Sequence, residues 1–272
     1  MKAITGIGIA GAFAALLLAV IMEGGNPASL INIPAFIIVA GGTAAATASS
    51  MTLARAKRMP KLMILAAKGG PDMEHGEAIR LMVRIAEKAR RDGLLALEDD
   101  LAAIDDQYTK TGLQLVVDGA DSDVVRAILQ SEIDGMAKRH QENATAFATA
   151  GGFAPTLGIL GTVLSLVHVL ENLNDPGSLG HSIAGAFLAT LYGVGSANLI
   201  FLPIGNKLKE LAAEELLYRE MLLEAILSIQ AGENPRMLAE KLETFLEPGQ
   251  RLGPDALRDR GGAAAEQMKE AA

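Results

Sequence analysis

The side chains of this sequence that could do chemistry are hydroxyls set among small residues in two long uncharged stretches. Thr162 lies in the stretch 143–170, and Thr190 lies in the stretch 176–206. The same stretches contain further polar and helix-distorting residues, namely Pro155, Thr156, Ser165, Tyr192, Ser196, Asn198 and Pro203. Hydroxyls beside glycines suit a narrow hydrated path, but in membrane helices they more often bond their own backbone or a neighbouring helix. From these residues alone, a pore role and a packing role both stay open.

Apart from histidine, neither stretch contains a carboxylate or a basic side chain. Proteins that move ions usually keep such a residue at membrane depth, where a bare charge is costly and is retained for use. His168 and His181 lie near the ends of their stretches that face the short loop 171–175. A histidine in contact with water at the membrane interface is the ordinary interpretation of that position. The two stretches therefore contain no carboxylate that could accept an ion.

Composition argues against an enzyme and against a nucleic-acid-binding protein. The 272 residues include no cysteine and have a formal net charge of −8. Without cysteine there is no disulfide framework and no Cys-ligated zinc. Neither a metal-ligand spacing, nor a nucleophile with its base, nor a glycine-rich phosphate loop is present, so we predict no cofactor and no enzymatic activity. The negative charge disfavours nucleic acid as a partner, whereas 50% apolar residues favour a membrane protein.

Four stretches without any Lys, Arg, Asp or Glu are each long enough to cross a bilayer, which takes about 20 mostly apolar residues. They comprise residues 3–22, 29–54, 143–170 and 176–206. Gly and Ala are frequent in all four, as is typical where bilayer helices pack closely. We predict an all-α membrane protein in which four transmembrane helices pair into two hairpins, with spans at about 3–22, 30–50, 146–170 and 180–204.

Basic residues lie on one side of this arrangement. The loops 23–28 and 171–175, which close the two hairpins, contain no Lys or Arg. The basic residues that flank the other ends of the spans are Lys2, Arg55, Lys57, Arg58, Lys61, Lys68, Lys138, Arg139, Lys207 and Lys209. Because cytoplasmic loops carry the excess of Lys and Arg, we expect both loops outside and both termini in the cytoplasm.

The predicted organisation therefore has five parts. Residues 1–54 form the first transmembrane hairpin, and residues 143–206 form the second, which contains the hydroxyls. Residues 55–142 form a helical cytoplasmic block, and residues 207–246 form further cytoplasmic helices. Residues 247–272 are rich in Gly, Pro, Ala and charge without periodicity, which predicts a disordered tail.

Helical periodicity predicts the elements of the cytoplasmic block. Residues 77–91 carry apolar side chains at helical spacing, and Gly93 is a stop signal for that helix. Residues 94–107 are predicted to form a second short helix. Ser122 can cap a third helix that runs on into the third span.

Capping residues also predict the helices after the fourth span. Residues 207–230 alternate charge with apolar side chains and are expected to extend that span as a helix. Asn234 and Pro235 form a helix start, with an N-cap followed by Pro at the first helical position. The apolar stripe of this last helix is predicted to comprise Met237, Leu238, Leu242 and Phe245.

The two hairpins, the block between them and two sequence strings together resemble the MotA/PomA family of flagellar motor stator subunits. The strings are APTLGILGTVLSLVHVLENL, around Thr162, and AFLATLYGVGSANLIFLPI, around Thr190. The resemblance extends from Met1 to about Leu246 and departs from the family pattern at Gly195, where a bulkier apolar residue is expected. Its most specific pieces are Ala186-Phe187, Ala189-Thr190-Leu191, Gly193 and Pro203.

This resemblance implies a division of labour that fits the missing carboxylate. Stator A subunits of this family form a ring, a pentamer, around the single membrane helices of a dimeric B-type subunit in the bacterial inner membrane. The B helix supplies the ion-accepting aspartate. Thr162 and Thr190, with Tyr192, would then lie along the ion path. Pro155 and Pro203 would sit where helix movement couples ion passage to the cytoplasmic part.

A second part of the resemblance concerns the rotor. The string RRDGLLALE, residues 90–98, resembles the segment with which the family contacts the rotor's switch ring. Arg90 and Glu98 are the matching charges. From the residues alone, the basic side chains of the helix predicted at 77–91 would be interpreted as a solvated face.

Three questions stay open at this point. An ExbB/TolQ-type motor subunit would also place threonines around a partner helix, but that type normally has three spans. A membrane scaffold that moves no ions would reduce the threonines to packing residues. The coupling ion is also open, because sodium near Thr162 and Thr190 would use several oxygen ligands, whereas protons need only the partner's aspartate and water.

Overall fold

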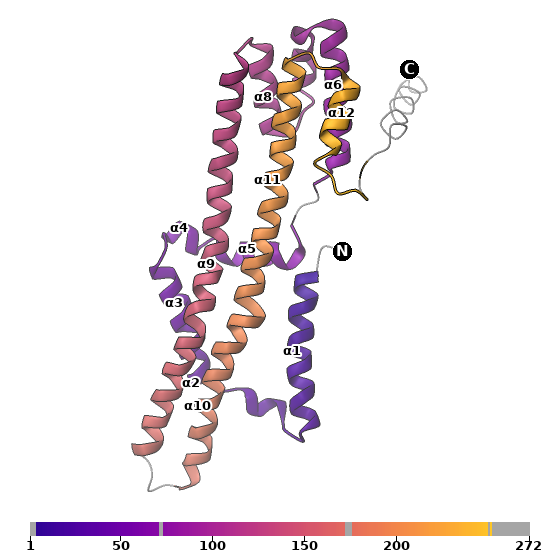
Figure 1. Ribbon diagram of the computed structural model, residues 1–272. Helices are drawn as coiled ribbons and strands as arrows, with labels where there is room; N and C mark the ends of the chain where they lie inside the picture. Colours follow the sequence, from indigo (N-terminus) through magenta and orange to yellow (C-terminus); the bar gives the residue numbers. More distant parts are fainter. Residues whose placement is uncertain (1–3, 71–72, 172–175, 250, 252–272) are drawn as a thin grey trace. The chain divides into compact units, whose positions relative to one another are not determined.

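The computed structural model describes residues 4–70, 73–171, 176–249 and 251, and every regular element among them is a helix (Figure 1). The all-α prediction is therefore confirmed. The chain divides into two compact units, one of Met1–Pro71 and Lys138–Ala212 and the other of Asp72–Ala137 and Ala213–Ala272. We call them the apolar unit and the polar unit and describe each by itself.

Three helices are long and apolar enough to cross a membrane, and they are found in Ile4–Met22, Ser122–Glu171 and Ser182–Gln230. The first is α1 (Ile4–Met22). The second is α9 (Ser122–Glu171), a single helix of 50 residues that contains the third predicted span. The last runs through α10 (Pro176–Ser196), the π-helical turn η4 (Ala197–Phe201) and α11 (Leu202–Gln230). The predicted helical continuations of the third and fourth spans are confirmed.

The second predicted span is shorter and less regular than the other three. A 3-10 turn, η1 (Pro27–Leu30), precedes it, and Asn32 caps its start by accepting a hydrogen bond from the Ala35 N–H at 3.0 Å. The helical run then comprises α2 (Ile33–Phe36), the π-helical turn η2 (Ile37–Gly41) and α3 (Gly42–Ser49). At 1.5 Å per residue this run, 33–49, is about 25 Å long.

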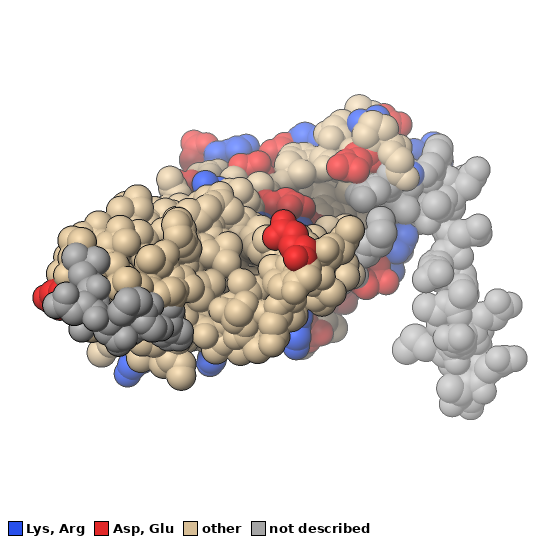
Figure 2. Space-filling view, turned by 90° about the horizontal axis from the view of Figure 1, so that it is seen from below, with Lys and Arg blue, Asp and Glu red and all other residues tan. Residues whose placement is uncertain are grey.

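The apolar unit has a small core and a largely uncharged surface. Its larger cluster of buried side chains contains Ala66, Ala144, Phe147, Ile204 and Leu208. Ala66 comes from α5 (Met59–Lys68), which follows the short helix α4 (Leu53–Ala56). No residue of α1 is buried. Seen from below, most of the visible surface carries no charge (Figure 2), as expected for helices that contact lipid rather than water.

In the polar unit, helices pack around one apolar core. Its elements include α6 (His75–Asp92), η3 (Leu94–Leu97), α7 (Glu98–Leu101), α8 (Gln107–Val117) and α12 (Pro235–Glu243). Ile79, Met82, Leu129 and Ile226 are among its fully buried side chains. The stop at Gly93 is confirmed, since this glycine follows α6 with a φ of 88°, which favours glycine.

Two predictions for the polar unit were wrong in part. The predicted helix at 94–107 ends early: residues 94–101 form two consecutive turns, η3 and α7. The chain leaves the helix after Leu101, and Asp106 caps a new helix, α8, which was missed. The start of α12 at Asn234 is confirmed by a 3.0 Å hydrogen bond to its side chain from the Arg236 N–H. In the stripe of α12, Leu238 and Leu242 are buried, but Met237 is 60% exposed. Most of the predicted tail, 247–272, lies outside the described residues.

Candidate ion-path site

The candidate site is built where α9 and α10 approach closely at glycines. A Cβ on Gly193 would lie 2.6 Å from the Ala154 carbonyl oxygen and 3.0 Å from the Gly158 Cα. A Cβ on Gly158 would in turn lie 2.9 Å from the Ala189 carbonyl oxygen. Any larger residue would force the helices apart, so the small residues of both spans set the distance between their backbones.

This close approach brings Thr162 and Thr190 together. Their hydroxyl oxygens are 2.6 Å apart. The Thr162 hydroxyl also lies 3.0 Å from the Gly158 carbonyl oxygen in its own helix and 3.0 Å from the Ala186 carbonyl oxygen in α10. Four oxygens from two helices therefore meet at one point, and both threonines are only partly buried.

The cluster has two hydroxyl protons, one on each threonine, for three oxygen–oxygen contacts. A hydroxyl has one proton to donate and two lone pairs, so Thr162 can donate to only one of the two carbonyls at a time. Thr190 can then donate to Thr162, which leaves the second carbonyl facing the Thr162 oxygen without a proton between them. Such a group of oxygens can rearrange its hydrogen bonds, and oxygens of this kind are the ligands that hard cations prefer.

Tyr192 lies apart from the threonine pair. Two residues further along α10, it points to another side of the helix, about 200° around the axis from Thr190. Its hydroxyl accepts a 2.9 Å hydrogen bond from the Asn32 N–H and donates to the Leu30 carbonyl. Its ring meets Phe36 edge-to-face at 6.3 Å. In this structure, Tyr192 fixes α10 to the start of the second span.

The two prolines are also separate from the threonines. Pro155 lies inside α9, two turns before Thr162, and leaves the Gly151 carbonyl without its usual helical partner. Pro203 is the second residue of α11, directly after the π-helical turn η4. Prolines and π-helical turns are the usual places at which long helices bend, so each of the two long helices has such a place.

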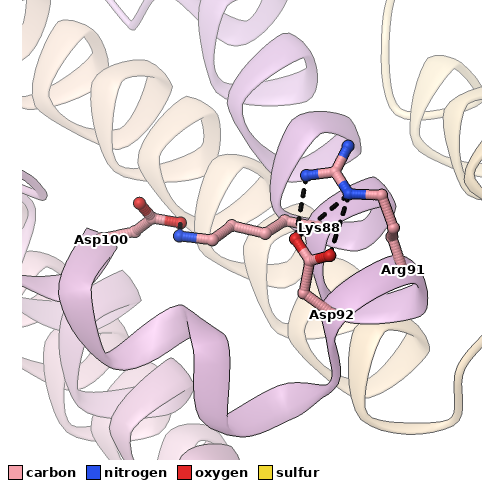
Figure 3. Close-up of polar contacts among 4 residues, drawn as sticks. All are labelled: Lys88, Arg91, Asp92 and Asp100. Carbon is pink, nitrogen blue, oxygen red and sulfur yellow. Dashed lines mark hydrogen bonds and ion pairs between the residues drawn. The ribbon is translucent and has the colours of Figure 1, made fainter.

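The two charges expected to meet the rotor lie in the polar unit. Arg90, in the last turn of α6, and Glu98, in the first turn of α7, are both exposed, and neither is paired with another described residue. Their neighbours are paired, as Figure 3 shows: Lys88 contacts Asp100 at 2.8 Å, and Arg91 contacts Asp92 at 2.9 Å. The hydrogen bonds from Arg91 lower the pKa of Asp92.

A partly buried polar contact that sequence analysis missed stabilises the polar unit. Asp106 caps α8 by accepting hydrogen bonds from the Thr109 N–H at 2.9 Å and from its hydroxyl at 2.7 Å, and it pairs with Arg219 at 2.6 Å. Burial alone would raise the pKa of Asp106, but the hydrogen bonds from Thr109 and Arg219 outweigh it and hold this pKa below its usual value. Asp is a preferred N-cap residue, so Asp106 was a signal that could have predicted the start of α8.

Comparison with known proteins first defines the class. The sequence model of the MotA/TolQ/ExbB proton channel family matches residues 100–221. This segment includes Thr162, Thr190 and both prolines. The family consists of ion channel subunits rather than enzymes.

Proteins that match most of the chain narrow this class. Motility protein A of Bacillus subtilis (strain 168) is 36% identical over 246 residues, which cover 90% of this chain and 91% of the relative. Motility protein A of Borreliella burgdorferi is 42% identical over 216 residues, 79% of this chain and 82% of the relative. Chemotaxis protein PomA of Vibrio alginolyticus is 34% identical over 251 residues, 92% of this chain and 98% of the relative.

Solved structures agree with these relatives. The C. jejuni MotAB structure matches with a TM-score of 0.88 and 30% identity, covering 93% of this chain and all of that chain. The flagellar MotAB stator complex of Bacillus subtilis matches with a TM-score of 0.83 and 36% identity, covering 90% and 96%. The chain therefore belongs to the MotA/PomA family of flagellar motor stator subunits. The relatives and solved structures named above are motility proteins and stator complexes, which favours this family over the ExbB/TolQ-type and scaffold alternatives.

Proposed function

We propose that this stator subunit uses the Thr162–Thr190 oxygen cluster to line the ion path that it forms with a B-type partner. The observation that carries the proposal is the 2.6 Å contact between the two hydroxyls beside two backbone carbonyls, at a glycine crossing of otherwise uncharged helices. A packing role needs only one bond for each hydroxyl, either to its own helix or to a neighbouring helix. Here the Thr162 hydroxyl lies within 3.0 Å of three oxygens, although it has a single proton to donate.

The proposed topology has four spans with both hairpin loops outside. Three long apolar helices and the shorter run 33–49 supply the spans. A run of about 25 Å falls short of the ~30 Å hydrocarbon core, a mismatch that a thinned bilayer or neighbouring helices can accommodate. Residues 51–142 and 207–272 are then cytoplasmic, in agreement with the positions of the basic residues.

The partner completes the site because the spans carry no carboxylate. In the proposed assembly, five copies of this chain surround the membrane helices of a B-type dimer, as the family resemblance implies, and the B aspartate accepts the ion. Ion binding neutralises a charge that is costly in a low-dielectric site, and this changes the contact between the B helix and the ring. One charge that crosses 100 mV releases about 2.3 kcal/mol, so each step of the ring is small.

The charges Arg90 and Glu98 are proposed to pass the resulting movement to the rotor. Both side chains are exposed, and neither is neutralised by another described residue. An exposed charge without an internal partner is free to pair with an opposite charge on another protein. Pro155 and η4 with Pro203 are the proposed bending points between the ion path and these charges.

The experiment that tests this function replaces the threonines by valine, which keeps volume and β-branching. Thr190→Val should nearly abolish ion flux and swimming, while the complex with the B subunit still assembles, since a lost hydrogen bond between membrane helices costs on average ~0.6 kcal/mol. Thr162→Val should be severe if sodium is coordinated there and mild if protons and water pass. Thr149→Val is the matched control, because its hydroxyl bonds only the Thr145 carbonyl of its own helix, at 3.0 Å. Normal swimming by Thr190→Val would assign the path elsewhere.

A further inference from the structure

A cavity of 730 Å³ separates α1 from the second span and from α10 in the apolar unit. Its wall is almost entirely apolar and includes Leu16, Val20, Phe36, Val39 and Ile200. The volume lies within the range of sites for small molecules, about 300–1,000 Å³. This cavity is distinct from the threonine cluster, since neither Thr162 nor Thr190 lines it.

The polar groups of the wall are mostly occupied by the protein itself. The Tyr192 hydroxyl bonds Leu30 and Asn32, and the Ser196 hydroxyl donates to the Gly193 carbonyl at 3.2 Å. Among the described residues of the wall, the Thr43 hydroxyl is buried without a partner. The cavity therefore suits an apolar occupant rather than one that needs many hydrogen bonds.

The depth of the cavity matches one leaflet of a bilayer. On α1 its wall extends from Phe13 to Glu23, the first residue after the helix. Ten residues of helix measure about 15 Å, at 1.5 Å each. This is half of the ~30 Å hydrocarbon core, and it begins at the end of α1 where the first hairpin turns.

The charge at that end indicates which headgroup fits. Glu23 is the single charged side chain among the described residues that line the cavity, and it is exposed. The hairpin loop 23–28 contains no Lys or Arg that could pair with Glu23 or hold a phosphate. A lipid headgroup with an ammonium group can approach this carboxylate, whereas an anionic headgroup without one is repelled.

Gly195 makes this cavity larger than the family pattern would leave it. It lines the wall, and a Cβ built on it has no heavy atom within 4 Å. It is also the position at which a bulkier apolar residue is expected from the resemblance. A bulky side chain there would extend into this open space.

We propose that this cavity binds one acyl chain of an outer-leaflet phospholipid whose headgroup carries an ammonium group, held at Glu23. A second copy of this chain is the competing occupant, and the cross-linking experiment below distinguishes it from a lipid. The proposal rests on the four-span topology proposed above, and reporters fused near Lys110 and Asn174 test that topology separately. A reporter that is active only outside the membrane should be silent when fused near Lys110 and active when fused near Asn174.

The experiment uses the full chain with its B subunit in vesicles that contain a phospholipid with a photoactivatable acyl chain. Two vesicle preparations differ only in the headgroup of that lipid, ethanolamine or glycerol. After illumination, labelled residues are mapped by mass spectrometry. We expect labels on cavity residues of α1 and α10, with a roughly two- to fivefold preference for ethanolamine, the range of an exposed ion pair. Glu23→Gln should remove the preference without removing the label.

Gly195→Phe should reduce the cavity label by at least about tenfold, because its ring displaces several methylenes of the chain. The matched control is Gly11→Phe in α1, where the added side chain also meets open space but does not line the cavity. Equal labelling in Gly195→Phe and Gly11→Phe would overturn the proposal. So would cross-links in the cavity to a second copy of the chain, or labels spread evenly around α1. Since the label is also mapped in the unchanged protein, the proposal does not depend on either variant folding.

Discussion

Replacing Gly193 by alanine tests whether the glycine crossing sets the geometry of the threonine pair. Gly193 lies one turn after Thr190 on α10, where its missing side chain lets α10 contact the α9 backbone. Gly195, two residues further, faces open space. The variants Gly193→Ala and Gly195→Ala therefore add the same methyl group to the same helix, in a closed place and in an open one.

The displacement that Gly193→Ala should cause in α10 follows from the distances at the crossing. The added Cβ would lie 2.6 Å from the Ala154 carbonyl oxygen and must retreat by about 0.8 Å to reach the 3.4 Å of an ordinary contact. If α10 moves by that amount, the 2.6 Å contact between the two threonine hydroxyls lengthens to about 3.4 Å. This is beyond the range of O–H···O hydrogen bonds, 2.5–3.0 Å. The overpacking costs about 1–3 kcal/mol, partly offset by the better helix propensity of alanine, up to about 1 kcal/mol.

The assay is ion flux into vesicles that contain this chain with its B subunit, together with swimming speed. Loss of one hydrogen bond between membrane helices is worth about 0.6–1.7 kcal/mol, so Gly193→Ala should reduce flux roughly 3- to 20-fold. Gly195→Ala should retain the flux of the unchanged protein and gain slightly in stability. Co-purification of the B subunit shows that both variants assemble.

Equal ion conduction by the two alanine variants would refute the proposed role of the glycine crossing. That outcome would mean that α9 and α10 absorb the extra methyl group without separating the hydroxyls. A Gly193→Ala variant that no longer binds the B subunit would also contradict it, because the expected displacement is too small to prevent assembly.

Two predictions concern the polar unit. Hydrogen bonds hold the pKa of Asp106 below its ordinary value. The ionised Asp106 carboxylate therefore stabilises the folded state above about pH 4, and this stabilisation is lost as the pH falls through the lowered pKa of the folded state. At neutral pH, Asp106→Ala removes the cap of α8 and the partly exposed pair with Arg219. It should cost about 1–2 kcal/mol and speed amide hydrogen exchange in α8 roughly 5- to 30-fold, whereas the exposed Asp118→Ala should not. Glu98→Lys should change stability by less than about 0.5 kcal/mol and yet impair rotation, with Asp99→Lys, equally exposed, as its control; equal impairment of both would refute a specific role for Glu98.

The sequence predicted well those elements that depend on residues close together in the chain. The end of α6 at Gly93 and the start of α12 at Asn234 each depend on a few adjacent residues with strong capping preferences. The long helices could be predicted because uninterrupted apolar residues leave few alternatives in a membrane. The irregular start of the second span at Asn32 was missed, since its boundary depends on a side-chain cap inside an apolar stretch.

For contacts between residues far apart in the chain, the sequence could predict the residue types but not the contacts themselves. Thr162 and Thr190 could be chosen for their hydroxyls, but their 2.6 Å contact depends on the register of two helices, which the glycines set. The hydrogen bonds of Tyr192 join residues about 160 positions apart, and no local pattern indicates them. Met237 fits the helical stripe of α12 and yet is exposed, whereas Leu238 and Leu242 of the same stripe are buried.

The two hydroxyl contacts of α10 constrain how the proposed motor can move. On one side, Thr190 joins α10 to α9 through Thr162, and on the opposite side Tyr192 joins it to the start of the second span. A rotation of α10 about its axis would break both contacts at once, whereas a tilt of α10 together with its neighbours breaks neither. The next place along the chain at which a tilt can be absorbed is η4 with Pro203, where the wider π-helical turn and the missing N–H weaken the helix. If the ring moves in response to the partner's aspartate, the physically cheapest motion is therefore a tilt of the packed spans that bends at η4, with the threonine cluster carried along intact.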